Sequence, residues 1–235
     1  MRTLKWITIG LLLVIGTQWA VAQSYAFGVK GGMALGIQRF NGLNNRDVLL
    51  GYQGDLFIET ADENEQFSLF AAAGYHQRGS AQIFRNGFNP FSGSIIPATS
   101  IRSVFHNAVL TAGGKQKFEW GASRYYYSIG LRGEYTIDWN LGFLDFLPNQ
   151  EQYVQRIIAG VTVGGGLEIP FSEFVAGIVE LNVHPDLTRQ MFLPQQRGVN
   201  PNGNSFVVNE QNIYNVSVEL TIGLRFLHKI EYVDY

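Results

Sequence analysis

Residues 215–226 read NVSVELTIGLRF and alternate between two kinds of side chain. Every second residue from Val216 to Phe226 is apolar, while the positions between them include Glu219 and Arg225. A period of two residues is the pattern of a β-strand with one apolar and one polar face. The apolar stripe ends on an aromatic residue shortly before the chain stops. The stretch therefore predicts a strand that lies between an apolar medium and a polar interior.

The composition of the 235-residue chain is unusual for a soluble protein. Charged residues make up 15% of it, against roughly 25% in an average soluble protein. Aromatic residues make up 14%, and there are 27 glycines. The chain contains no cysteine, which excludes disulfides, thiol nucleophiles and Cys-ligated metal or iron–sulfur sites.

Residues 1–22 have the features of a cleaved signal peptide. Arg2 and Lys5 precede an apolar stretch, and Ala20-Val21-Ala22 is a small-residue cleavage motif. The stretch is shorter than the roughly 20 residues that a membrane-spanning helix needs, and no apolar run long enough to form such a helix follows it. We expect the mature chain, residues 23–235, to form one domain. Processing removes two of the 17 Lys and Arg residues and none of the 19 Asp and Glu residues. The mature chain therefore has a net negative charge, which argues against a nucleic-acid partner.

The alternating pattern recurs along the mature chain in unusually long stretches. It is regular in YYYSIGLRGEYTI (125–137) and poorest in 103–118, where a strand is inferred mainly from its place in the series. Strands of soluble proteins most often have about 5–6 residues, whereas a tilted transmembrane strand needs about 9–11. The predicted strands cover about 24–38, 47–59, 67–79, 103–118, 124–138, 154–169, 174–185 and 213–228.

The connections between these strands support a membrane barrel. Long and short connections alternate along the chain, as they do in outer-membrane barrels with short periplasmic turns and longer outer loops. A sheet in hydrocarbon must also close on itself, because every backbone polar group needs a partner within the protein. The sequence therefore predicts an all-β fold, an eight-stranded antiparallel up-and-down transmembrane β-barrel in the cell outer membrane. The longer extracellular loops are expected at about 39–46, 80–102, 139–153 and 186–212.

The sequence resembles the PorT-like outer-membrane β-barrel family over most of the mature chain. The likeness is carried by FGVKGGMALG (27–36), by the segment from GYQGDLFIE to FSLFAAAGYHQRGSA (51–81), by YYYSIGLRGEY (125–135), by GVTVGGGLEIPF (160–171) and by the closing NVSVELTIGLRF. The resemblance implies an eight-stranded barrel of Gram-negative type. The founding member of the family is tied to the type IX secretion system, and most members have no assigned role. The fourth strand and the HPDLT segment depart from the family pattern.

Ten charged residues are expected to face the lumen. An eight-stranded barrel is just wide enough for its own side chains to fill it, and charges buried there must pair. A structural polar network is the preferred interpretation, and a gated ion or proton path through the same residues is the alternative. The ten residues are Lys30, Asp55, Glu59, Arg78, Arg132, Glu134, Glu168, Glu180, Glu219 and Arg225.

Catalytic, metal and cofactor sites are not expected. Gly113-Gly114-Lys115 lacks the remaining residues of a phosphate-binding loop. His76 and His184 could approach the outer rim near Ser80 and Asp186, but no spacing supports a catalytic triad. Each histidine is interpreted as a hydrogen-bonding residue of the lumen or rim, and metal binding by His76 and His184 as a minor alternative.

The long loops are the expected functional surface, because loops on a rigid scaffold often bind ligands and partners. Mutual packing of their apolar side chains is the other interpretation. The expected role is structural or interaction-based, with a protein partner at the loops and a secretion assembly as one such partner. A narrow porin-like channel for small solutes or ions is the alternative, and a lipid-modifying enzyme is a third. Outer-membrane lipid and, during insertion, the barrel-assembly machinery are further expected partners. The candidate loop contacts are Phe84, Phe88, Phe91, Met191, Phe192 and Phe206.

Overall fold

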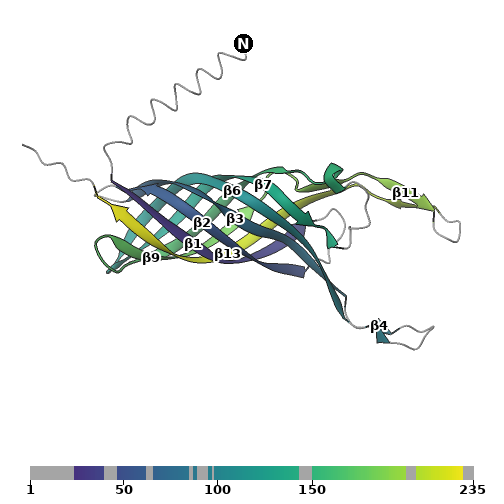
Figure 1. Ribbon diagram of the computed structural model, residues 1–235, viewed down its shortest axis with the longest axis horizontal. Helices are drawn as coiled ribbons and strands as arrows, with labels where there is room; N and C mark the ends of the chain where they lie inside the picture. Colours follow the sequence, from purple (N-terminus) through teal and green to yellow (C-terminus); the bar gives the residue numbers. More distant parts are fainter. Residues whose placement is uncertain are drawn as a thin grey trace, which may run out of the picture.

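The computed structural model describes residues 24–39, 47–61, 66–84, 87–88, 95–96, 98–142, 150–199 and 205–229. The predicted signal peptide lies outside these residues. Eight long strands form a closed antiparallel ring in the order β1-β2-β3-β6-β7-β8-β9-β13, with β1 paired to β13 (Figure 1). Their bounds are β1 (Tyr25–Arg39), β2 (Asp47–Thr60), β3 (Phe67–Phe84), β6 (Thr99–Trp120), β7 (Ser123–Asn140), β8 (Ile157–Pro170), β9 (Val175–Pro185) and β13 (Gln211–His228). This ring confirms the predicted fold class.

The closing seam joins the first and last strands over the full length of β1. Tyr25 pairs with His228 at one end and Arg39 with Tyr214 at the other. Each remaining strand pairs with its neighbour in the chain, so the ring of strands has no open edge. A closed ring satisfies the backbone hydrogen bonds without help from solvent, which is the condition for a sheet inside hydrocarbon.

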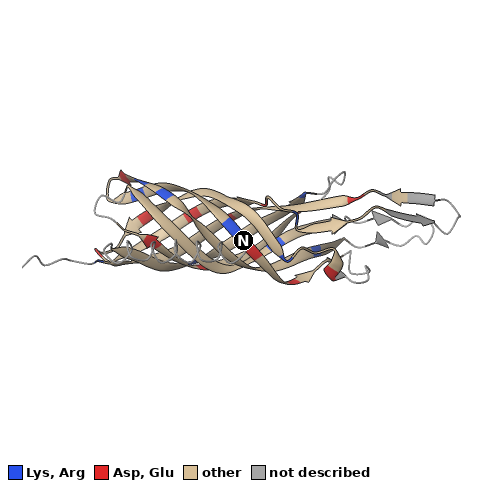
Figure 2. Ribbon diagram, turned by 90° about the horizontal axis from the view of Figure 1, so that it is seen from above, with Lys and Arg blue, Asp and Glu red and all other residues tan. Residues whose placement is uncertain are grey.

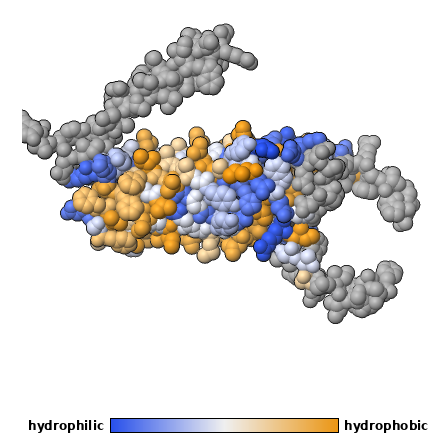
Figure 3. All heavy atoms as spheres, viewed as in Figure 1, coloured by the Kyte–Doolittle hydropathy of each residue, from blue (hydrophilic) through white to orange (hydrophobic). Residues whose placement is uncertain are grey.

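The outer wall of the barrel is apolar. Alternate residues of the strands point outward, and Leu110, Leu131 and Ile157 are 67%, 72% and 76% exposed. Figure 3 shows apolar residues spread over the barrel wall. An apolar side chain of this size gains about 1.5–3 kcal/mol on leaving water, so this exterior is suited to lipid. Among the described residues, no helix is long and apolar enough to cross a bilayer.

The connections between strands differ in length at the two ends of the barrel, with short ones at one end and longer ones at the other. We call the end with Gly121-Ala122 and residues 171–174 the turn end, and the opposite end the loop end. The described chain begins and finishes at the turn end, where Tyr25 pairs with both Thr60 and His228. The loop end carries β4 (Gly87–Phe88), β5 (Ile95–Ile96), the 3-10 helix η2 (Gln150–Gln152), β10 (Met191–Leu193), β11 (Gln196–Val199) and β12 (Ser205–Val208), several of which project beyond the ring in Figure 1.

Two of the expected loops contain more regular structure than the sequence indicated. Residues 80–84 and 99–102 continue the β3–β6 ladder, which ends at the pair Phe84 and Thr99. Part of 186–212 forms β10 against β13, and β11 pairs with β12. Backbone pairing therefore continues beyond the apolar wall, where the amphipathic pattern that marks a membrane strand no longer applies.

The poorly alternating segment 103–118 forms a regular strand, β6. Its odd-numbered residues from Ser103 to Lys117 face inward. The alternation is obscured because the apolar Phe105 and Val109 are among these inward residues, while the polar His106 and Gln116 lie on the other face. The irregularity lies in its partner β7, where Ile137 is left between the pairs His106–Asp138 and Asn107–Thr136. Such a bulge shifts the following residues by one position. As a result Trp139 packs against a buried apolar cluster at the loop end of the lumen.

Candidate functional site in the barrel lumen

The turn half of the lumen is organised around Glu59 of β2. Its carboxylate lies 3.0 Å from Lys115 Nζ, 2.9 Å from Lys117 Nζ and 2.6 Å from Arg225 Nε. Arg225 also lies 3.1 Å from Glu168. These contacts connect β2, β6, β8 and β13 across the barrel. We call this group, extended by Glu180 below, the turn-side cluster.

Glu180 extends the turn-side cluster toward the middle of the barrel. It contacts Lys30 and lies 3.4 Å from Lys115, and the hydroxyl of Tyr126 donates a hydrogen bond of 2.6 Å to it. Lys115 also lies over the rings of Phe57, Phe70 and Tyr126, at 4.8–5.3 Å from their centroids. Aromatic faces attract an ammonium group, so Lys115 is held by both carboxylates and rings.

A second group, the loop-side cluster, surrounds Arg78 of β3. The guanidinium has no solvent exposure and lies 3.1 Å from Glu134, 3.3 Å from Glu219 and 3.4 Å from Asp186. Arg132 lies 2.5 Å from both Glu134 and Asp186. Asp186 follows the end of β9, and its carboxylate also accepts the backbone N–H of Asn215 at 3.2 Å. These contacts therefore link β3, β7 and β13 with the first residue after β9.

Two histidines complete the loop-side cluster. His76 lies 3.0 Å from Asp55 and 3.3 Å from Glu219, and His184 lies 2.8 Å from Glu219. Thr162 Oγ1 lies 2.9 Å from His184 Nδ1, which puts a hydroxyl, an imidazole and a carboxylate in the order of a hydrolytic triad. All three side chains are buried, and the adjacent cavity has a volume of about 20 Å³. Such a cavity has room for a water molecule but not for a substrate.

The structure brings all ten predicted lumen residues into these two clusters (Figure 2 shows charged positions along the barrel). Sequence reasoning did not include Lys115, Lys117, Tyr126 or Asp186 in the predicted lumen network. Both lysines could have been found from the alternation along β6, because they stand at odd-numbered positions, as Ser103 does, and these positions share one face of the strand. His76 and His184 meet inside the lumen, with ring centroids 5.8 Å apart, rather than at the rim. Among the described residues, no group of three His, Cys, Asp or Glu is arranged to hold a metal ion.

An apolar cluster lies at the loop end of the lumen, and we call it the lid. Met191 of β10 pairs with Ile213 of β13 and is only 1% exposed. The buried members are Phe105, Leu141, Val154, Met191 and Ile213, with Trp139, Tyr153 and Leu193 packed against them. The lid consists of side chains from β6, β10, β13 and the loop-end connections. It places apolar groups where a conducting pore would need water.

The candidate loop contacts therefore differ in position. Met191 belongs to the lid and is not exposed for a partner, because β10 continues the barrel wall between Val154 and β13 with this side chain turned inward. Phe192 is half-buried, and its ring lies 4.3 Å from the guanidinium carbon of Arg189. The structure describes only the backbone of Phe84, Phe88 and Phe206, and Phe91 lies outside the described residues.

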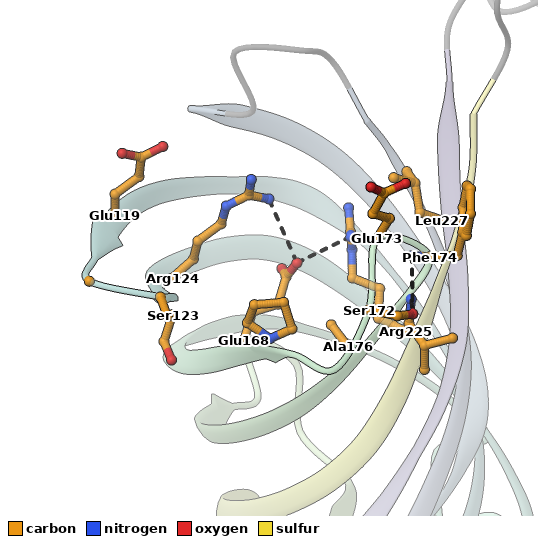
Figure 4. A pocket seen from close by; sticks show the side chains of 14 residues that line it. Glu119, Ser123, Arg124, Glu168, Ser172, Glu173, Phe174, Ala176, Arg225 and Leu227 are labelled. Carbon is orange, nitrogen blue, oxygen red and sulfur yellow. Dashed lines mark hydrogen bonds and ion pairs between the residues drawn. The ribbon is translucent and has the colours of Figure 1, made fainter.

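A cavity of about 330 Å³ lies at the turn end (Figure 4). Arg124 and Arg225 approach Glu168 from two sides, at 3.9 and 3.1 Å. The hydroxyl oxygen of Ser172 accepts the backbone N–H groups of Phe174 and Val175 and shapes the 171–174 turn that borders the cavity. The turn-side cluster lies at the inner end of this cavity.

Comparison with solved structures finds outer-membrane proteins. Neisserial surface protein A matches with a TM-score of 0.48 and 10% identity, covering 86% of this chain and 96% of the other. A major outer-membrane protein of Thermus thermophilus matches with a TM-score of 0.49 and 11% identity, covering 88% of this chain and 100% of the other. OprG of Pseudomonas aeruginosa matches with a TM-score of 0.48 and 12% identity, covering 87% of this chain and 97% of the other. No family model and no curated protein matches the sequence.

The geometry of the chain itself defines its class. The closed antiparallel ring, the apolar outer wall, the polar interior and the sorted connections are together the features of an integral β-barrel protein of the outer membrane.

Proposed function

We propose that the protein is a non-conducting outer-membrane barrel that acts through contacts of its loop end with a partner protein. The observation that carries this proposal is the filled lumen, in which two ion-paired clusters lie beneath the apolar lid. A barrel that is filled in this way is a rigid support for its loops. Binding residues commonly lie on loops that a rigid scaffold positions.

Planar-bilayer recording tests the filled lumen against the alternative of a narrow channel. The purified, folded barrel is expected to give no steady single-channel current in salt solution, whereas a known porin in the same bilayer conducts. A steady current from the unmodified protein would overturn the proposal and favour the channel.

The partner itself is tested by site-specific photo-crosslinking in native membranes. A photoreactive residue at Val207 on β12, which is 50% exposed, is expected to form an adduct with one specific protein. The control position is Leu131, which is 72% exposed on the apolar wall and should contact lipid. Absence of any specific adduct from Val207 counts against the interaction role. The resemblance of the sequence to the PorT-like family supports a secretion assembly as the source of the partner.

A lipid-modifying activity receives less support from the geometry. The relay of Thr162, His184 and Glu219 is buried beside a cavity of about 20 Å³, so a lipid cannot reach it. We propose that deletion of the protein leaves lipid A and phospholipid composition unchanged. A new or missing lipid species in the deletion strain would contradict this.

A further inference from the structure

A groove of about 480 Å³ lies at the loop end of β3, β6 and β7, apart from the cavities of the lumen. Its polar lining includes Gln77, Arg102, His106 and Asn140. Gly142 borders it with a φ of 60°, a conformation that favours glycine. A side chain there would also collide with the chain, because a Cβ atom on Gly142 would lie 2.4 Å from the carbonyl oxygen of Arg102.

The groove begins where the apolar wall ends. On β6 the outward positions run from the exposed Leu110 through Ala108 to His106, and then through Val104 to Arg102. The neighbouring outward position of β3 changes from Tyr75 to Gln77. Figure 3 shows polar residues gathered at the loop end of the apolar wall. The groove is therefore placed at the level of lipid headgroups, above the part of the wall that acyl chains would cover.

Aromatic side chains hold one wall of the groove in place. The Tyr75 hydroxyl and Nδ1 of His106 share a hydrogen bond, and Tyr75 packs against Tyr52 with ring centroids 5.6 Å apart. Tyrosines of this kind form the aromatic girdle at the boundary between hydrocarbon and headgroups. This contact orients the His106 ring beside the groove.

The charges at the groove favour an anion. Arg102 is exposed and carries a permanent positive charge, and in the β3–β6 ladder it lies opposite Ala81. The adjacent carboxylate is Asp138, the register partner of His106 on β7, and it accepts the backbone N–H of Trp139 at 2.9 Å. Guanidinium groups bind phosphate oxygens by charge-assisted hydrogen bonds, and the amides of Gln77 and Asn140 can donate further ones.

We propose that this groove binds the phosphorylated headgroup of a glycolipid of the outer leaflet. The phosphate contacts Arg102 and His106, and the acyl chains lie along the apolar wall around Leu110. Short turns face the periplasm in outer-membrane barrels, so the loop end, and with it the groove, faces the outer leaflet. The site is separate from the lumen and from the partner contact proposed above.

Native mass spectrometry of the intact barrel tests this assignment. The protein is reconstituted in phosphatidylcholine nanodiscs that contain bis-phosphorylated lipid A, and the retained lipid A per barrel is measured. Arg102→Gln is expected to reduce retention roughly tenfold, the loss of about one charge-assisted hydrogen bond. Asp138→Asn is expected to increase retention, because it removes the negative charge beside the groove. Arg156→Gln is the matched control, since Arg156 is an exposed loop-end cation that the groove does not include.

A second lipid separates headgroup recognition from apolar contact. Dephosphorylated lipid A, with the same acyl chains, should be retained no better than phosphatidylcholine. Equal retention of the two lipid A forms, or unchanged retention in Arg102→Gln, would overturn the proposal. Release of lipid A by inorganic phosphate alone would also overturn it, because the groove would then be a simple phosphate site.

Discussion

Glu219 shows how a single carboxylate is kept inside a membrane barrel. It has no solvent exposure, and its oxygens lie 2.8 Å from His184, 3.3 Å from His76 and 3.3 Å from Arg78. Ser217 also donates a hydrogen bond of 2.9 Å to it. These partners offset the cost of removing the charge from water.

We expect Glu219→Gln to lower the free energy of unfolding by about 3–5 kcal/mol, because removal of one carboxylate leaves the buried charge of Arg78 less well compensated. Urea unfolding of the barrel in detergent micelles measures the change. Glu151→Gln is the matched control, since the Glu151–Arg156 pair is solvent-exposed with an N–O distance of 3.8 Å, and such pairs contribute about 0–1 kcal/mol. Equal effects of the two substitutions would mean that the loop-side cluster is not a stabilising network.

At the scale of the element, the seam between β1 and β13 depends on close backbone approach. Gly32 faces β13, and a Cβ atom there would lie 1.9 Å from the carbonyl oxygen of Leu220. Gly133 of β7 is the opposite case, because an added Cβ atom would meet no atom within 4 Å. The same residue type therefore has different roles in two strands of one sheet.

Gly32→Ala is expected to destabilise the barrel by about 1–3 kcal/mol, the usual cost of overpacking, whereas Gly133→Ala should change stability by no more than about 0.5 kcal/mol. The two variants can be compared by the temperature at which the folded band is lost on gel electrophoresis. If Gly32→Ala retained the stability of the unmodified protein, the tight contact at the seam would be refuted.

At the scale of the whole molecule, the sorted connections predict an orientation. The turn end carries Ala122 and the loop end carries Val207, and both residues are exposed. The chain has no cysteine, so a single introduced cysteine reports its own position without a background signal.

On intact cells, a membrane-impermeant maleimide should label Val207→Cys and leave Ala122→Cys unmodified until the outer membrane is permeabilised. The reason is that longer loops face outward and short turns face the periplasm. Labelling of Ala122→Cys alone on intact cells would reverse the orientation and would place the proposed lipid groove in the wrong leaflet.

The amino-acid sequence by itself determined the class, the number of barrel strands and the face on which most residues of the regular strands lie. Lipid acts on each strand separately through a period of two residues, so a local pattern is sufficient. Even in 103–118, where alternation failed, the position in the series predicted a strand, and β6 is there.

Only the tertiary structure decided which charges meet. Arg78 and Glu219 are 141 residues apart in sequence, and their contact depends on the height of each residue in the closed barrel. The alternating pattern does not determine that height, because the height of each residue is set by the register of all eight strands together. The same holds for the bulge at Ile137 that turns Trp139 to the lid, for the contacts of Asp186 with Arg78 and Arg132, and for the groove beside Arg102, all of which arise from pairing between strands.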